Sequence, residues 1–250
     1  MKGATLTAPS SDPLGERAGP RVARRLLRDL SLVLIISGLL LLVDAAITLL
    51  WQEPVTAAIA LVERASVNQR FLSYRTAPLS RIERRALTAL PQQRERIAYL
   101  ARRERRELQP GDAVGRITMP RIGANFLVVQ GTDEGSLEKG PGHYPGTALP
   151  GMGKTVAIAG HRTTFLAPFR HIDALRPGDR IVLRMPYGRF VYVVQYHRIV
   201  SPTSWWVVRD VGYDRLVLSA CNPLFSAAQR IVVFARLQDV QASAPTTGVA

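Results

Sequence analysis

The chain has 250 residues, and 47% of them are hydrophobic, which is enough to build a core in one or two domains. Its formal net charge of +14 suits an anionic partner, namely nucleic acid, a membrane surface or a cell-wall polymer. Only 7% of the residues are aromatic and the arginines cluster beside an apolar segment, so the composition favours a membrane over nucleic acid. The single cysteine excludes an internal disulfide.

The N-terminal part predicts a membrane anchor. Residues 1–29 are polar and predict a disordered cytoplasmic tail that ends in four closely spaced arginines. Residues 30–51 predict one uncleaved transmembrane helix, because 22 residues reach about 33 Å and the hydrocarbon core is roughly 30 Å thick. The one charge, Asp44, costs roughly 2.5 to 3.5 kcal/mol, which the Leu, Ile and Val residues outweigh. The arginines predict that the chain after the helix is extracellular.

Residues 52–112 predict a helical stalk. They are rich in Arg, Glu, Ala, Leu and Gln and lack the alternation of strands. The run Arg102–Glu107 is typical of a solvated helix face. Two interpretations stay open, a stalk that contacts lipid headgroups or wall polymers and a spacer that only separates the membrane from the next domain.

Residues 113–238 predict a mainly β domain. The pattern changes from Val114 onward to about eight short strands with one or two short helices, which is typical of a closed or nearly closed β-barrel. We expect the helices near residues 134–138 and 165–175. Residues 239–250 predict a flexible C-terminal tail.

Three apolar segments of this domain each carry one chemically capable residue at an end. The segment 156–160 leads into His161, the segment from Arg215 ends on Cys221, and Arg230 opens the next apolar run. A lone cysteine is most often a small buried hydrophobic residue. Its place at a strand end, together with the histidine and the arginine, favours a catalytic nucleophile instead.

These motifs resemble the sortases, the cysteine transpeptidases of Gram-positive surfaces, over roughly residues 114–237. The resemblance rests on Ala159–Arg162, on the Leu-x-x-Cys strand and on the arginine that follows it. It implies a sortase-type closed barrel. It also implies that Cys221 is the nucleophile, that His161 is the general acid and base, and that Arg230 stabilises the oxyanion or the substrate carbonyl.

The segment Gly142–Thr147 further resembles the class E-like sortases of high-GC bacteria. That resemblance implies that Tyr144 lies in the substrate groove, where its hydroxyl can engage the peptide backbone. His143 either lines the site or is a solvated loop histidine. The family's usual Thr-Leu-x-Thr-Cys reads here Val-Leu-Ser-Ala-Cys, so both threonines are absent and Ser219 and Ala220 are the candidate substrate contacts at this strand.

The implied activity is cleavage of a Thr-Gly bond in a C-terminal sorting signal of the LAXTG or LPXTG kind, followed by transfer of the acyl group to an amine. The implied partners are secreted proteins that carry the signal, a peptidoglycan precursor or pilin amine, and membrane lipid, with no nucleic acid. Two alternatives stay open. One is a membrane-tethered wall-binding β-domain without chemistry, and the other is a Cys-His hydrolase that releases its product to water.

We expect neither a cofactor nor a metal. The four histidines and one cysteine form no metal-ligand spacing such as C-x-x-C. The segment Ala148–Thr155 nearly satisfies a phosphate-binding loop, with Ala in place of the first Gly. A strand rather than a helix is predicted after it, however, so the nucleotide-binding interpretation is disfavoured.

Overall fold

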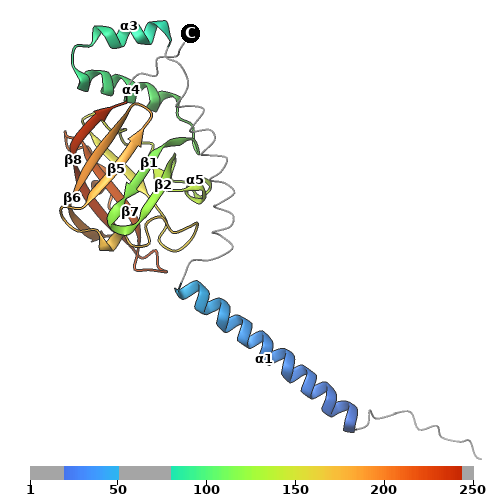
Figure 1. Ribbon diagram of the computed structural model, residues 1–250. Helices are drawn as coiled ribbons and strands as arrows, with labels where there is room; N and C mark the ends of the chain where they lie inside the picture. Colours follow the sequence, from blue (N-terminus) through green and yellow to red (C-terminus); the bar gives the residue numbers. More distant parts are fainter. Residues whose placement is uncertain (1–19, 51–79, 244–250) are drawn as a thin grey trace, which may run out of the picture. The chain divides into compact units, whose positions relative to one another are not determined.

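The structure, a computed structural model, describes residues 20–50 and 80–243 (Figure 1). The predictions for residues 1–19, for residues 51–79, which include the first part of the stalk, and for the last seven residues lie outside the described residues. Helix α1 and the part of the chain from Trp51 onward form two separate units.

Helix α1 spans Pro20–Leu50. The predicted disordered tail is therefore wrong for residues 20–29, which are helical. Proline is favoured at the first position of a helix, and the Arg, Ala and Leu residues after it are good helix formers. By length and composition, Arg24–Ile47 is able to cross a membrane.

The stalk prediction is wrong at its C-terminal end, because helix α4 (Gln93–Glu107) belongs to the core of the barrel domain. Ile97 and Ala101, which lie four residues apart, are buried against barrel residues. Glu104 continues this buried stripe, so the Arg102–Glu107 run is not solvated on all sides. Leu100 of the same helix also packs against this core, but only partly buried, so the apolar stripe is narrow and the sequence pattern alone indicates a polar helix.

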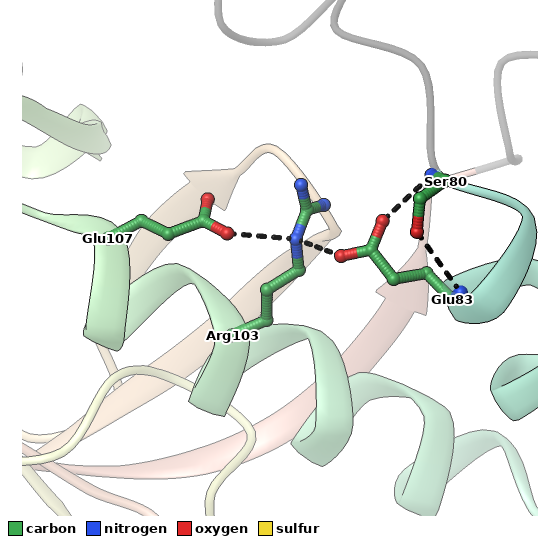
Figure 2. Close-up of polar contacts among 4 residues, drawn as sticks. All are labelled: Ser80, Glu83, Arg103 and Glu107. Atoms are coloured by element: carbon green, nitrogen blue, oxygen red, sulfur yellow. Dashed lines mark hydrogen bonds and ion pairs between the residues drawn. The ribbon is translucent and has the colours of Figure 1, made fainter.

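Helix α3 (Arg81–Ala89) is joined to α4 by a polar cluster (Figure 2). Ser80 and Glu83 form a capping box, in which the serine hydroxyl accepts from the Glu83 amide at 3.3 Å and the carboxylate accepts from the Ser80 amide at 2.8 Å. The Arg103 Nε then lies between the Glu83 and Glu107 carboxylates. The amide of Ser80 is the main cause that lowers the pKa of Glu83, so this carboxylate stays charged beside Arg103.

Eight strands close into a barrel in the order β1-β2-β3-β4-β7-β8-β6-β5, which confirms the predicted fold class. Neighbouring strands are antiparallel except for the parallel pairs β2–β3 and β4–β7. The strands are β1 (Ala113–Met119), β2 (Ala124–Gln130), β3 (Gly142–His143), β4 (Thr155–Ala159), β5 (Arg180–Met185), β6 (Gly188–Val200), β7 (Arg215–Asn222) and β8 (Gln229–Ala242). The short helices of this domain are η1 (Pro120–Ile122), α5 (Glu134–Lys139), η2 (Ile172–Ala174) and η3 (Trp205–Val208).

Strands β4 and β7 and residues 231–235 of β8 are apolar on both faces. Leu216 and Leu218 point into the main core inside the barrel. Val217 lies in a second cluster outside it, with Phe234 of β8 and Val207 of η3. Because both faces are covered, these strands are nearly continuous apolar runs, and this made them easy to predict from the sequence.

Two boundaries differ from the prediction. The helix expected over residues 165–175 is reduced to η2, because Phe165, Leu166 and Ala167 have φ angles of 50°, 64° and 40° in the left-handed region. The proline at 168 disfavours helical geometry in the residue before it. The C-terminal tail begins later than residue 239, because β8 continues to Ala242 and pairs there with β6.

We expect Ile97→Ala to destabilise the barrel domain by about 2 to 4 kcal/mol, because it leaves a cavity between α4 and the barrel. Ile97 is 3% exposed, and a Cβ on Gly151 would meet its side chain. Ile82→Ala is the matched control on α3, since Ile82 is 79% exposed. Thermal unfolding of the detergent-solubilised chain measures both. Equal melting temperatures for the two variants would show that α4 is not part of the folded domain.

Candidate active site

Cys221 and Arg230 face each other across the antiparallel pair of β7 and β8. Their register pairs these two residues directly, next to Ala220 with Ile231. Directly opposed residues share one face of the sheet with Cβ atoms about 4.5 to 5.5 Å apart. Since Ile231 belongs to the inner core, Cys221 and Arg230 emerge on the outer face.

His161 is brought to the same place by the parallel pairing of β4 with β7. Ala159 pairs with Ser219, and the Gly160 amide continues the ladder by donating to the Ser219 carbonyl at 3.0 Å. His161 and Cys221 each lie two residues beyond that pair. Because neighbouring strands are about 4.8 Å apart and side chains alternate, both residues leave the ends of their strands on the outer face. The site therefore lies across β4, β7 and β8.

The imidazole of His161 is partly shielded from water. It lies 5.3 Å from the ring of Phe165, measured between centroids. Burial is the main cause that lowers the pKa of His161 below its ordinary value, although the carboxylates of Glu138 and Glu134 on α5 act in the opposite direction. The neutral imidazole is therefore favoured near pH 7, and it is able to accept a proton.

Cys221 is a free, partly exposed thiol, as a nucleophile must be. Arg230 is held at the rim of the site by its own loop. Its Nη1 donates to the carbonyls of Ala227 and Gln229, each at 2.9 Å. These two bonds fix one edge of the guanidinium, and Nε and Nη2 carry the remaining donors.

Two of the four predicted substrate contacts lie on the outer face. The Tyr144 hydroxyl is 3.2 Å from the Ser219 hydroxyl, and Tyr144 packs against the outer apolar cluster. Ser219 lies two residues before Cys221 and therefore shares its face. The contact between these two hydroxyls links the residue after β3 to β7, the strand that carries Cys221.

The side chains of the other two candidate substrate contacts are buried. Ala220 points into the barrel core, because it lies between the outward-facing Ser219 and Cys221. His143 is 1% exposed and belongs to β3, so it neither lines the site nor sits in a solvated loop. Pairing of β3 with both β2 and β4 turns its ring into the barrel, and a two-residue strand gives no sequence pattern by which to predict this.

The ring of His143 is neutral and fully hydrogen-bonded. Its Nε2 lies 2.9 Å from the Ala148 carbonyl oxygen and 3.2 Å from the Thr147 hydroxyl. Its Nδ1 lies 2.8 Å from the Oε1 oxygen of the Gln130 side chain. Burial is the main cause that lowers the pKa of His143 to about 4.

The segment Ala148–Thr155, which resembles a phosphate-binding loop in sequence, binds a carboxylate of the chain itself. The amides of Gly151 and Gly153 donate to the Asp214 carboxylate at 3.2 and 3.1 Å. Strand β4 follows the loop, as the sequence indicated. Two amides of this loop are thus already occupied by a carboxylate of the chain itself. Among residues 20–50 and 80–243, no group of three His, Cys, Asp or Glu side chains is placed to hold a metal ion.

Sequence reasoning missed one buried residue of the site, Arg162. Its guanidinium contacts the carbonyl of Cys221 and the side chain of Asn222. The signal in the sequence is weak, because an arginine that follows a strand end is ordinarily solvated.

The arrangement combines a thiol, a neutral imidazole and a guanidinium at the ends of three adjacent strands. Such a set is able to form and resolve a thioester, which defines a cysteine acyl-transfer site on a closed β-barrel. A family model described as the sortase domain matches residues 117–238. The chain belongs to the sortase family, whose members are cysteine transpeptidases.

Individual relatives agree with this. Sortase D of Bacillus subtilis is 30% identical over 132 residues, which are 51% of this chain and 65% of the relative, so the chain spans less than two thirds of it. The structure of sortase E from Streptomyces avermitilis is 33% identical, covering 54% of this chain and 93% of that one, with a TM-score of 0.49. The SrtF sortase of Corynebacterium diphtheriae is 26% identical, covering 58% and 93%, with a TM-score of 0.53.

We expect the barrel to lose stability as the pH falls from 6.5 to 4. Over this range the unfolded chain binds a proton at His143 and the folded chain does not, so acid favours unfolding, by about 3 kcal/mol in total. His143→Gln should flatten this pH dependence, whatever its effect at pH 7. His197→Gln, at an exposed position, should leave the slope unchanged. Denaturant unfolding at a series of pH values measures the free energy of unfolding of the wild type and both variants. If the slope of this free energy against pH persists in His143→Gln, other groups cause the pH dependence.

Proposed function

We propose that this protein is a membrane-anchored extracellular cysteine transpeptidase that cleaves a Thr-Gly bond in a sorting signal and transfers the acyl group to an amine. The observation that carries the proposal is the register of β4, β7 and β8, which brings His161, Cys221 and Arg230 to one outer face. Helix α1, with a segment able to span a membrane, supports the anchor.

The first half of the reaction forms the thioester. Cys221 gives its proton to the neutral imidazole of His161, and the resulting thiolate attacks the threonine carbonyl. Arg230 donates to the oxygen on which negative charge develops. The imidazolium then passes its proton to the glycine nitrogen, so the C–N bond breaks and the amine leaves. His161 is neutral again at the end of this half.

The second half consumes the thioester. An incoming amine attacks the acyl carbon while His161 takes a proton from its nitrogen and returns it to the cysteine sulfur. The products are a new amide and the free thiol. A peptidoglycan precursor or a pilin lysine is the amine that we propose, whereas attack by water would make the protein a hydrolase.

Tyr144 and Ser219 support a class E-like substrate preference. Their hydroxyls meet on the outer face, two residues from the nucleophile along β7, and give the groove polar donors and acceptors for a peptide backbone. The likeness to the structure of sortase E1 from Streptomyces coelicolor, which is 25% identical with a TM-score of 0.51, supports the same subclass. We therefore propose that Ala at the second position of the signal is accepted at least as well as Pro.

A cationic surface on the helices next to the barrel supports contact with anionic lipid. Glu83 and Arg103 are paired and Glu104 is buried, so arginines dominate the exposed charge of α3 and α4. Each arginine near an anionic membrane contributes about 1 kcal/mol of attraction. The exposed arginines are Arg81, Arg84, Arg85, Arg94, Arg96, Arg102, Arg105 and Arg106.

The function is tested by mass spectrometry of the full chain in detergent with an LAXTG or LPXTG peptide. We expect a peptide thioester on Cys221, its absence in Cys221→Ala, and an amide product when an amine is added. A chain that binds the peptide without forming the adduct would support the wall-binding alternative. A free acid formed in spite of excess amine would support the hydrolase.

We expect Arg230→Lys to lose nearly as much turnover as Arg230→Ala, about 10²- to 10³-fold. The guanidinium is fixed by two carbonyls through one nitrogen and presents its other donors in a rigid plane, which a lysine ammonium cannot reproduce. Rates of thioester formation measure the effect. If Arg230→Lys keeps a turnover near that of the wild type, Arg230 does not stabilise the oxyanion and acts on the Cys221 thiol only through its positive charge.

A further inference from the structure

Arg162 links the strand end that carries the histidine to the strand end that carries the cysteine. It follows His161 directly, and its side chain is 3% exposed. Its Nη1 donates to the carbonyl oxygen of Cys221 at 3.4 Å and to the Asn222 Oδ1 at 3.1 Å. A buried guanidinium thus contacts the backbone of the nucleophile itself.

The other edge of the same guanidinium holds the loop between β4 and β5. Its Nε and Nη2 both donate to the Arg170 carbonyl at 3.4 Å. Its Nη2 also pairs with the Asp173 carboxylate at 3.1 Å, and the Asp173 side chain is 55% exposed. One side chain therefore joins three segments, namely the end of β4, the end of β7 and the loop that enters η2.

The loop that Arg162 holds is the one that shields His161. It folds back so that the Phe169 amide donates to the His161 carbonyl at 2.9 Å, and the ring of Phe169 packs where a side chain on Gly160 would lie. Phe165, whose ring contacts the imidazole, lies in the left-handed run of this loop. Such a run is unfavourable for residues other than glycine, so contacts from outside the run must maintain it.

The placement of Arg162 is poorly explained by stability alone. Removing a guanidinium from water is costly, and a charge partner that is half exposed returns little of that cost. An apolar side chain would fill the same space. What the arginine adds is a planar set of donors that reaches acceptors in three segments at once.

We propose that Arg162 is a positioning residue of the active site, which holds the loop around His161 against the end of β7 and thereby aligns the imidazole with the Cys221 thiol. The inference rests on the proposed function, because it assigns Arg162 a task in that reaction. Asp173 is the charge partner that keeps the guanidinium in place.

The test compares Arg162→Lys, Arg162→Gln and Asp173→Asn in the full chain, well below each melting temperature. We expect kcat for thioester formation to fall about 10- to 100-fold in both Arg162 variants, since a small misalignment of reacting groups costs this much. The peptide KM should stay within about threefold, because a guanidinium whose side chain is 3% exposed offers a bound peptide almost no surface. The kcat of Asp173→Asn should fall less than that of the Arg162 variants. The kcat of Arg176→Gln, at an exposed position in the same loop, should equal that of the wild type.

A second readout does not depend on the peptide. The pH dependence of Cys221 alkylation reports the protonation of His161. The titratable and charged groups around His161 are Glu134 and Glu138 on α5, Cys221 on β7 and Arg230 on β8. If the loop loosens in Arg162→Gln, water reaches the imidazole and its pKa rises toward 6.5. We therefore expect the His161-dependent inflection, absent in His161→Ala, to move to higher pH in this variant.

The outcomes separate the two proposals. Wild-type kcat in Arg162→Lys, or a loss that only follows the folded fraction, would overturn the positioning role. A raised KM with unchanged kcat would overturn it too, by placing Arg162 in peptide binding. If the wild-type chain forms no thioester, the proposed function fails, and the alkylation profiles then decide the inference alone. A profile unchanged between wild type and Arg162→Gln overturns it.

Discussion

The parallel pairing of β4 with β7 is the constraint on which the rest of the site depends. Side chains alternate along a strand, so a slip of one residue between these strands would turn either His161 or Cys221 into the barrel core. The register is held by apolar residues on both faces, with Leu218 inside and Val217 outside. The separate register of the antiparallel pair β7–β8 then places Arg230 opposite the cysteine.

The polar residues around this sheet divide into two groups by burial. His143, Asp214 and Arg162 are enclosed or half-enclosed, and each is bonded to backbone or side-chain partners that fix a strand end or a loop. Cys221 and Arg230 are partly exposed on the outer face. Buried groups with satisfied hydrogen bonds give a rigid frame, and exposed groups on that frame are available to a peptide.

The barrel domain extends beyond the strands that form it. Helix α4 contributes Ile97 and Ala101 to the same core as β6 and β7, and α3 is joined to α4 through the Arg103 cluster (Figure 2). Helix α4, which precedes the first strand, is thus packed onto the barrel. Strand β8 ends the domain at Ala242, paired to the start of β6.

The sequence by itself determined the fold class and most of the strands, and it singled out His161, Cys221 and Arg230 as candidate chemical residues, because strands covered on both faces leave unbroken apolar runs whose ends are visible. The sequence also named Tyr144 and Ser219 as candidate substrate contacts, and the structure places their hydroxyls 3.2 Å apart. Only the tertiary structure decided which way His143 and Ala220 face, since side-chain direction depends on strand pairing that lies outside the local pattern. The same holds for α4 and Arg162, whose polar composition predicts exposure and whose burial comes from segments distant in the chain.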